Sequence, residues 1–211
     1  MRLAPMAGGR IVIALACAVA TLLGCATSQP TAERVSAAAG AISEDMYAPI
    51  GGIEQWITIR GDDRTNPIVL VVHGGPGNPM SPVADSLFQS WQRDFTIVQW
   101  DQRGAGRTYG RHGPSVASTM NVERMALDGV EVAEFLTEYL GQDRVTIFAT
   151  SWGSVLGVHM AHARHDLFHA YVGHSQIVEW GANIAATYER LLERAHAAGD
   201  QTSIDTLNEM G

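Results

Sequence analysis

The stretch "RVTIFATSWGSVLG", Arg144 to Gly157, decides the fold because its pattern of residue types changes from strand-like to helix-like at one corner. Residues 144–150 are apolar and β-branched, which predicts a buried strand. A Ser-Trp-Gly corner follows, and the apolar residues from Gly153 onward predict a helix. A buried strand that turns directly into a helix is the repeating unit of an α/β sheet. Ser151 stands at this turn and is therefore the first candidate nucleophile.

The segments on both sides of the corner continue the alternation of strands and helices. The apolar runs "NPIVLVV" and "FTIVQWD" predict two more strands, the first buried on both faces as in a parallel sheet, and "FHAYVGHSQIV" predicts a fourth. "NVERMALDGVEVAEFLTEYLG" has helical spacing, with Asn121 as N-cap and Gly141 as stop, and predicts a crossover helix. The expected fold class is α/β, a doubly wound, mostly parallel sheet.

Two further elements flank this region. "MYAPIGGIEQWITIRG" alternates around Gly51 and Gly52, which predicts a hairpin of half-buried strands. From Trp180 onward the chain is helix-forming to the last residue. We therefore expect a core over residues 46–179 and a helical segment over residues 180–211.

The first residues have the composition of an export signal. Arg2 and Arg10 precede or flank about fifteen apolar residues, fewer than the roughly twenty of a spanning helix. The run ends in "LLGC", which resembles the lipobox of bacterial lipoproteins. Residues 1–24 are then a signal peptide, Cys25 is the lipidation site, and residues 25–45 are a tether. We expect an exported protein, held at a membrane of the bacterial cell envelope by its lipid anchor; a plain signal peptide is the alternative.

Composition restricts the chemistry. The 211 residues carry a formal charge of −8, which argues against nucleic acid as a partner. All fourteen basic residues are Arg, so Schiff-base chemistry and a lysine base are excluded within this chain. His162 and His165 are three apart, but no HExxH pattern accompanies them, and we expect no metal and no cofactor.

The corner at Ser151 departs slightly from the usual nucleophile turn. That turn is written Gly-x-Ser-x-Gly, whereas this chain has Ala149 in the first position and Gly153 in the last. Alanine is the next smallest side chain, which a tight corner can tolerate. A turn or cap serine without chemistry is the competing interpretation.

A glycine-rich loop, "HGGPG" at residues 73–77, directly follows the first buried strand. Glycines let main-chain N–H groups approach a developing oxyanion. Gly74 and Gly75 can supply one donor, and the N–H of Trp152 can supply the other. A phosphate loop is the competing interpretation, but neither glycine-rich phosphate motif surrounds it. His73 is expected to order the loop rather than to act as a base.

"WDQRGAGRT", residues 100–108, reads as a surface turn held by a salt bridge from Asp101 to an arginine. Together with HGGPG and SWGS, in this order, it resembles the proline iminopeptidase family of α/β-hydrolases, over about Ile50 to Met210. The resemblance implies a serine aminopeptidase that releases N-terminal residues, typically proline, through an acyl-enzyme. It implies Ser151 as catalytic nucleophile, an oxyanion hole of Gly74, Gly75 and Trp152, and site support from His73, Asp101, Arg103 and Arg107.

The family's triad also needs a later acid and histidine, and neither has an obvious counterpart here. The histidines after Ser151 are expected to be solvated surface residues: His159, His162, His165, His169, His174 and His196. We therefore expect residues 180–211 to be the start of a helical lid, with the last strands of the sheet missing and an unpaired edge left. Peptidase activity on proline arylamides is expected to be negligible. An ester or amide hydrolase of the same fold, or a non-catalytic lipoprotein, remain alternatives.

Overall fold

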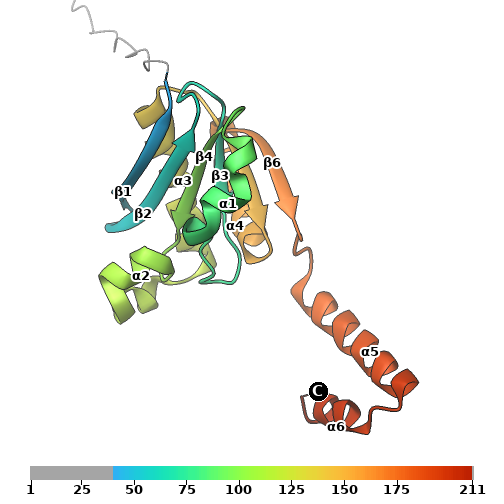
Figure 1. Cartoon of the computed structure of the whole chain (residues 1–211). Coiled ribbons are helices and arrows are strands. Elements are labelled where there is room, and N and C mark those ends of the chain that lie inside the picture. The colour runs from blue at the N-terminus through green and yellow to red at the C-terminus, as the bar shows by residue number, and fades with distance from the viewer. Residues whose placement is uncertain (1–39, 211) are drawn as a thin grey trace, which may run out of the picture. The chain divides into compact units, whose positions relative to one another are not determined.

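The computed structural model describes residues 40–210, all within one compact unit. Its centre is a six-stranded sheet in the order β1-β2-β4-β3-β5-β6 (Figure 1). The pairs β1–β2 and β2–β4 are antiparallel, and the pairs among β4, β3, β5 and β6 are parallel. The expected α/β sheet is confirmed, with strands β1 (Ile42–Ile50), β2 (Ile53–Gly61), β3 (Ile68–Val72), β4 (Thr96–Asp101), β5 (Val145–Thr150) and β6 (Phe168–His174).

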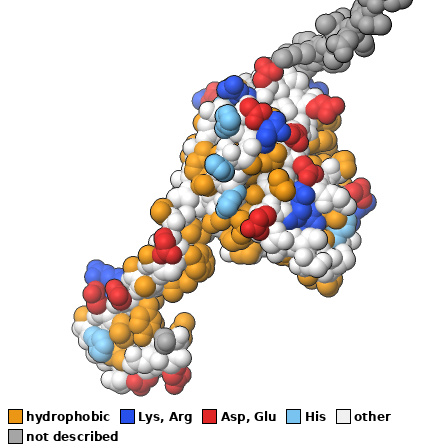
Figure 2. Space-filling model, turned by 180° about the vertical axis from the view of Figure 1, so that it is seen from behind, with side chains coloured by type: hydrophobic (Ala, Val, Ile, Leu, Met, Phe, Trp, Pro, Cys, Tyr) orange, Lys and Arg blue, Asp and Glu red, His pale blue; other side chains and the backbone are white. Residues whose placement is uncertain are grey.

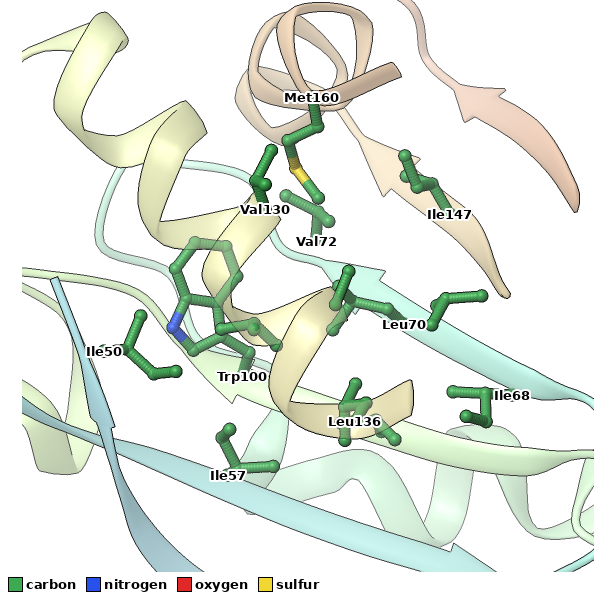
Figure 3. Packing of buried hydrophobic residues seen from close by; sticks show 14 of the residues in the cluster. Ile50, Ile57, Ile68, Leu70, Val72, Trp100, Val130, Leu136, Ile147 and Met160 are labelled. Atoms are coloured by element: carbon green, nitrogen blue, oxygen red, sulfur yellow. The ribbon is translucent and has the colours of Figure 1, made fainter. Parts of the chain in front are cut away.

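Strand β3 is buried on both faces, as its continuous apolar run predicts. Ile68, Leu70 and Val72 join the large core cluster, to which α3 (Val122–Leu140) and α4 (Trp152–Ala163) also contribute. Figure 3 shows side chains from the hairpin, the parallel strands and these helices meeting around Trp100. Val69 and Val71 point to the opposite face and pack with Ala84 and Phe88 in a second cluster. The sheet therefore has helical cover on both faces.

The crossover helix begins and ends where its caps predict. The Asn121 side chain accepts a hydrogen bond from the N–H of Arg124 at 2.8 Å, which satisfies one free donor of the first turn. Gly141 ends α3 in the left-handed conformation, with φ of 67°. The tight turn between β1 and β2 likewise uses two glycines with positive φ, Gly51 and Gly52.

The predicted boundary between tether and core, at residue 45, is wrong, because the first strand begins at Ile42. Residues 42–45 belong to β1, where they pair with residues 58–61 of β2. Ile42 is buried, and Asp45 accepts a hydrogen bond from Arg60 at 2.5 Å. An edge strand needs only one partner and one apolar face, so a small, polar sequence can still form it. The predicted signal peptide, Cys25 and the rest of the tether lie outside the described residues.

The chain also contains short helices that periodicity did not reveal. Between β3 and β4 lie η1 (Ser81–Val83), α1 (Ala84–Phe88) and η2 (Gln89–Trp91). After β4 come α2 (Gly106–His112) and η3 (Gly113–Thr119), and η4 (His165–Leu167) precedes β6. These elements are too short to show a repeating apolar stripe.

The predicted helical segment after Trp180 consists of two helices. Helix α5 (Trp180–Ala198) ends at Gly199, whose φ is 67°, and α6 (Gln201–Met210) follows. The Glu179 carboxylate caps α5 by accepting the N–H of Gly181 at 3.0 Å. Apolar side chains are visible across this segment in Figure 2. Within residues 40–210, no helix has the length and hydropathy needed to cross a membrane.

Candidate active site

Ser151 occupies a sharp, constrained corner between β5 and α4. Its φ of 51° and ψ of −122° lie in a region that residues other than glycine rarely adopt. Its main chain is held on both sides, because its N–H donates to His174 O at 2.9 Å and its carbonyl accepts the N–H and Oγ–H of Ser154. The residue is exposed. The corner therefore presents the hydroxyl to solvent.

Two glycines let α4 approach the sheet behind this corner. A Cβ on Gly153 would lie 2.1 Å from Val72 O, so only glycine allows the helix to start against the end of β3. A Cβ on Gly157 would lie 2.9 Å from Ala149 Cβ. Ala149 itself is fully buried. The alanine that replaces the usual first glycine of the corner is accommodated because a glycine lies opposite it.

The HGGPG loop lies directly beside Ser151. A Cβ on Gly74 would be 3.1 Å from Ser151 Cβ and 3.6 Å from its Oγ. The Gly74 carbonyl accepts the N–H of Asn78 at 3.2 Å and a hydrogen bond from the His73 ring at 2.9 Å. Gly75 has φ of 119°, a conformation suited to glycine. The loop and the corner therefore come within contact distance, as expected for an oxyanion site.

Trp152 is the first residue of α4. Its main-chain N–H has no acceptor inside the helix, because the first N–H groups of any helix lack an i−4 partner. That makes it available as a donor next to Ser151. The assignment of Gly74, Gly75 and Trp152 to an oxyanion hole stays a prediction.

His73 joins two loops and is not placed as a base. Its Nε2 accepts the main-chain N–H of Gln102 at 3.2 Å, so its Nδ1 carries the proton that is donated to Gly74 O. The Gln102 side chain in turn donates to His73 O at 2.9 Å. Burial lowers the pKa of His73 below its usual value, against smaller opposing effects of the Gly74 bond and the Asp101 charge. A neutral imidazole with a hydrogen bond at each ring nitrogen therefore orders the loop.

Asp101 anchors the loop after β4, but among residues 40–210 no arginine side chain forms a salt bridge with it. Its carboxylate accepts the Ser81 hydroxyl at 2.6 Å and the main-chain N–H of Arg107 at 2.8 Å, at the start of α2. The Arg107 guanidinium instead lies 4.5 Å over the Trp56 ring. Asp101 thus ties α2 to the segment that leaves the HGGPG loop.

Arg103 lies in a buried ionic cluster away from the Ser151 cavity. Its guanidinium contacts Asp128 with two bonds, at 2.8 Å and 3.0 Å, and donates to Gly51 O at 2.8 Å. Asp128 is fully buried and also accepts from Gln55 at 2.9 Å and Arg124 at 2.8 Å. The cluster fastens the DQRG loop to α3 and to the β1–β2 turn. Its effect on the site is therefore indirect.

A cavity of about 690 Å³ opens beside Ser151. Of the predicted site residues it includes Gly74, Gly75 and Ser151, whereas Trp152 and the four support residues are not part of its lining. Its remaining lining is Asn78, Pro79, Met80, Val83, Leu87, Phe88, Phe148, Thr150 and His174. None of these nine was singled out as a site residue from the sequence.

That His174 would lie at the cavity was not predicted from the sequence. All six histidines after Ser151 are exposed, as expected, and Figure 2 shows histidines on one face of the molecule. His174 nevertheless lines the cavity, with its Nδ1 3.1 Å from Thr150 Oγ1 and its ring stacked on Phe148. The sequence did contain a signal for this position of His174: it ends the strand that follows β5, and the carboxyl ends of neighbouring parallel strands lie together. Within residues 40–210, no hydrogen bond joins Ser151 Oγ to an imidazole nitrogen.

Comparison with known proteins agrees with this geometry. Residues 67–208 match the family described as alpha/beta hydrolase fold. The chain belongs to the α/β-hydrolase family. Probable aminopeptidase YbaC of Bacillus subtilis (strain 168) is 33% identical over 144 residues, which cover 68% of this chain and 45% of that protein. A probable proline iminopeptidase of Streptomyces coelicolor is 36% identical over 102 residues, 48% of this chain and 30% of the relative.

Solved structures give the same result. A proline iminopeptidase-related protein from Thermus thermophilus is 26% identical with a TM-score of 0.50, covering 63% of this chain and 44% of the other. An epoxide hydrolase mutant from Vigna radiata is 27% identical with a TM-score of 0.50, covering 62% and 38%. The predicted resemblance to proline iminopeptidase-like α/β-hydrolases is confirmed. The chain spans less than half the length of the relatives and structures named here.

Proposed function

We propose that this chain carries the nucleophile and the oxyanion site of a serine hydrolase that releases N-terminal residues from peptides. The observation that carries the proposal is the close approach of the HGGPG loop to the Ser151 corner. Exposed Ser151 sits at a strained corner, and a Cβ on Gly74 would lie 3.6 Å from its Oγ. The aminopeptidase relatives support the choice of peptide substrates.

In the proposed reaction, Ser151 Oγ forms a bond to the scissile carbonyl carbon and gives its proton to a general base, the role that a histidine has in the family which the sequence resembles. The carbonyl oxygen becomes an oxyanion that accepts hydrogen bonds from the N–H groups of Gly75 and Trp152. The C–N bond then breaks, and the leaving amine takes up a proton. Water hydrolyses the resulting ester and restores the serine.

A fluorophosphonate probe tests this proposal, because it labels an activated serine. Because no imidazole within residues 40–210 hydrogen-bonds to Ser151 Oγ, labelling of this chain is expected to be slow. It should occur at one site, and Ser151→Ala should abolish the signal. The matched control is Ser175→Ala, because Ser175 is also exposed and also has positive φ, of 52°. Labelling that survives in Ser151→Ala, or that is lost in Ser175→Ala alone, would contradict the assignment.

Two alternatives differ from this proposal in what they predict. An ester or small-amide hydrolase on the same fold would also be labelled, but would turn over aryl esters of simple carboxylic acids faster than prolyl esters with the same leaving group. A non-catalytic lipoprotein would not be labelled at all. The peptidase proposal is preferred because the curated relatives named above are aminopeptidases.

We also propose that the protein is exported and anchored by lipid on Cys25, on the strength of the LLGC motif. Labelled palmitate should be incorporated by the parent chain expressed in a bacterial host. Cys25→Ala should remove the label and release the protein from the membrane fraction. Cys17→Ala changes the other cysteine of the chain and should leave both unchanged.

A further inference from the structure

The segment from Met80 to Phe88 has two apolar faces. Ala84 and Phe88, four residues apart, are buried against the sheet with Val69, Val71 and Ile97. This contact fixes α1 to the core. A short surface helix needs only one such face.

The second face consists of Met80, Val83 and Leu87, at the spacing i, i+3 and i+7. Val83 and Leu87 are 50% and 53% exposed, so large apolar surfaces are left in water. The neighbouring polar side chains have partners of their own: Asp85 lies 3.6 Å from Arg60, and the Ser86 hydroxyl donates to Val83 O at 2.8 Å. The Met80–Val83–Leu87 face borders the cavity next to Ser151.

The cavity has no formally charged side chain among its lining residues, apart from the titratable imidazole of His174. Phe88 and Phe148 extend the apolar wall, and their rings meet edge to face at 6.2 Å. An ammonium or carboxylate placed against this wall would lose water without gaining an opposite charge. An apolar group placed there would cover the exposed surfaces of Val83 and Leu87.

We propose that Met80, Val83 and Leu87 form a specificity subsite for an uncharged apolar side chain, branched aliphatic or aromatic, on the residue whose carbonyl carbon Ser151 attacks. The inference rests on the proposed function and names the substrate class of the same site. A cavity of about 690 Å³ has room for such a group and for the reacting centre. Binding there would remove apolar surface from water, which favours these groups over charged ones of equal length.

The test uses two fluorophosphonates that differ only in the substituent on phosphorus, n-hexyl or a chain of equal length ending in trimethylammonium. The parent chain should react about tenfold faster with the hexyl probe, since the trimethylammonium group would lose water without gaining an opposite charge in the cavity. Leu87→Asp should reduce this ratio at least severalfold. Leu127→Asp, at a similarly exposed leucine of α3 outside the cavity, should leave the ratio unchanged.

Val83→Thr provides a second variant of nearly the same shape, which should lower the ratio without affecting folding. Equal rates for both probes at Ser151 in the parent chain would overturn the subsite and leave the proposed function standing. Absence of any Ser151 labelling would contradict the proposed function instead. Saturation-transfer NMR with the unreactive diethyl hexylphosphonate then decides the subsite separately: transfer that is lost in Leu87→Asp supports it, and no transfer in the parent chain overturns it.

Discussion

Ala149 and Gly157 face each other so closely that a Cβ on Gly157 would lie 2.9 Å from Ala149 Cβ. The same added atom would lie 2.7 Å from the ring of Tyr171. The first position of the nucleophile corner and the second turn of α4 therefore share one small space. A larger residue on one side requires a glycine on the other.

Gly157→Ala should accordingly destabilise the chain by about 1–3 kcal/mol, the usual cost of overpacking a well-filled core. Urea unfolding measures the change. Adding Ala149→Gly should recover part of it, since one of the close contacts of the new methyl group is removed. Strict additivity of the two substitutions would contradict the shared-space explanation.

Gly74→Ala should slow fluorophosphonate labelling of Ser151 with little loss of stability. The new methyl group would lie 3.1 Å from Ser151 Cβ and from Thr150 O, so the loop must retreat from the corner by a few tenths of an ångström. Gly110→Ala is the control, because nothing lies within 4 Å of its added Cβ. The idea fails if both variants label at the parental rate.

Asp128→Ala should destabilise the fold by about 3–5 kcal/mol, because it leaves the buried Arg103 guanidinium without its charge partner. Replacing both residues, Arg103→Met with Asp128→Leu, should cost less than the single change. The exposed Arg93–Asp94 pair supplies the control, and Asp94→Ala should leave the urea midpoint within error. A small effect of Asp128→Ala would mean that the cluster is not essential to the fold.

The stability of the chain should fall as the pH drops below about 6.5, in part because of His73. Burial lowers the pKa of His73 in the folded state from 6.5, so the unfolded chain binds the proton first. The stabilisation is therefore complete above pH 6.5 and is lost as the pH falls toward the lowered pKa. His73→Asn keeps a donor for Gly74 O and should flatten the change in unfolding free energy between pH 7.5 and 5.5. His196→Asn, at an exposed histidine, should follow the parent.

Much of the fold follows from local patterns. Long apolar runs predicted β3, β4 and β5, and the caps at Asn121 and Gly141 gave the limits of α3. Short elements were missed, because one or two turns of helix leave no period to detect. Strand β1 begins earlier than expected, since pairing with β2 stabilises residues whose own sequence shows no strand pattern.

The site divides in the same way. That Ser151 and the two glycines of the loop lie together was predictable, because backbone strain and close approach require particular residue types. The apolar wall was missed, because Met80, Val83 and Leu87 reach the cavity through the tertiary placement of α1. Arg103 was predicted to support the site, but in the structure it is paired with Asp128. Asp128 is distant in sequence, so this pairing could not be predicted.

The two hydrogen bonds on the Gly74 carbonyl have a consequence for the neighbouring amide. A trans peptide is planar and its C=O and N–H groups point in opposite directions, so the bonds from the His73 ring and Asn78 also fix the direction of the Gly75 N–H. That dipole is oriented before any substrate arrives. The loop is thus preorganised, and no reorientation of this amide adds to the activation barrier.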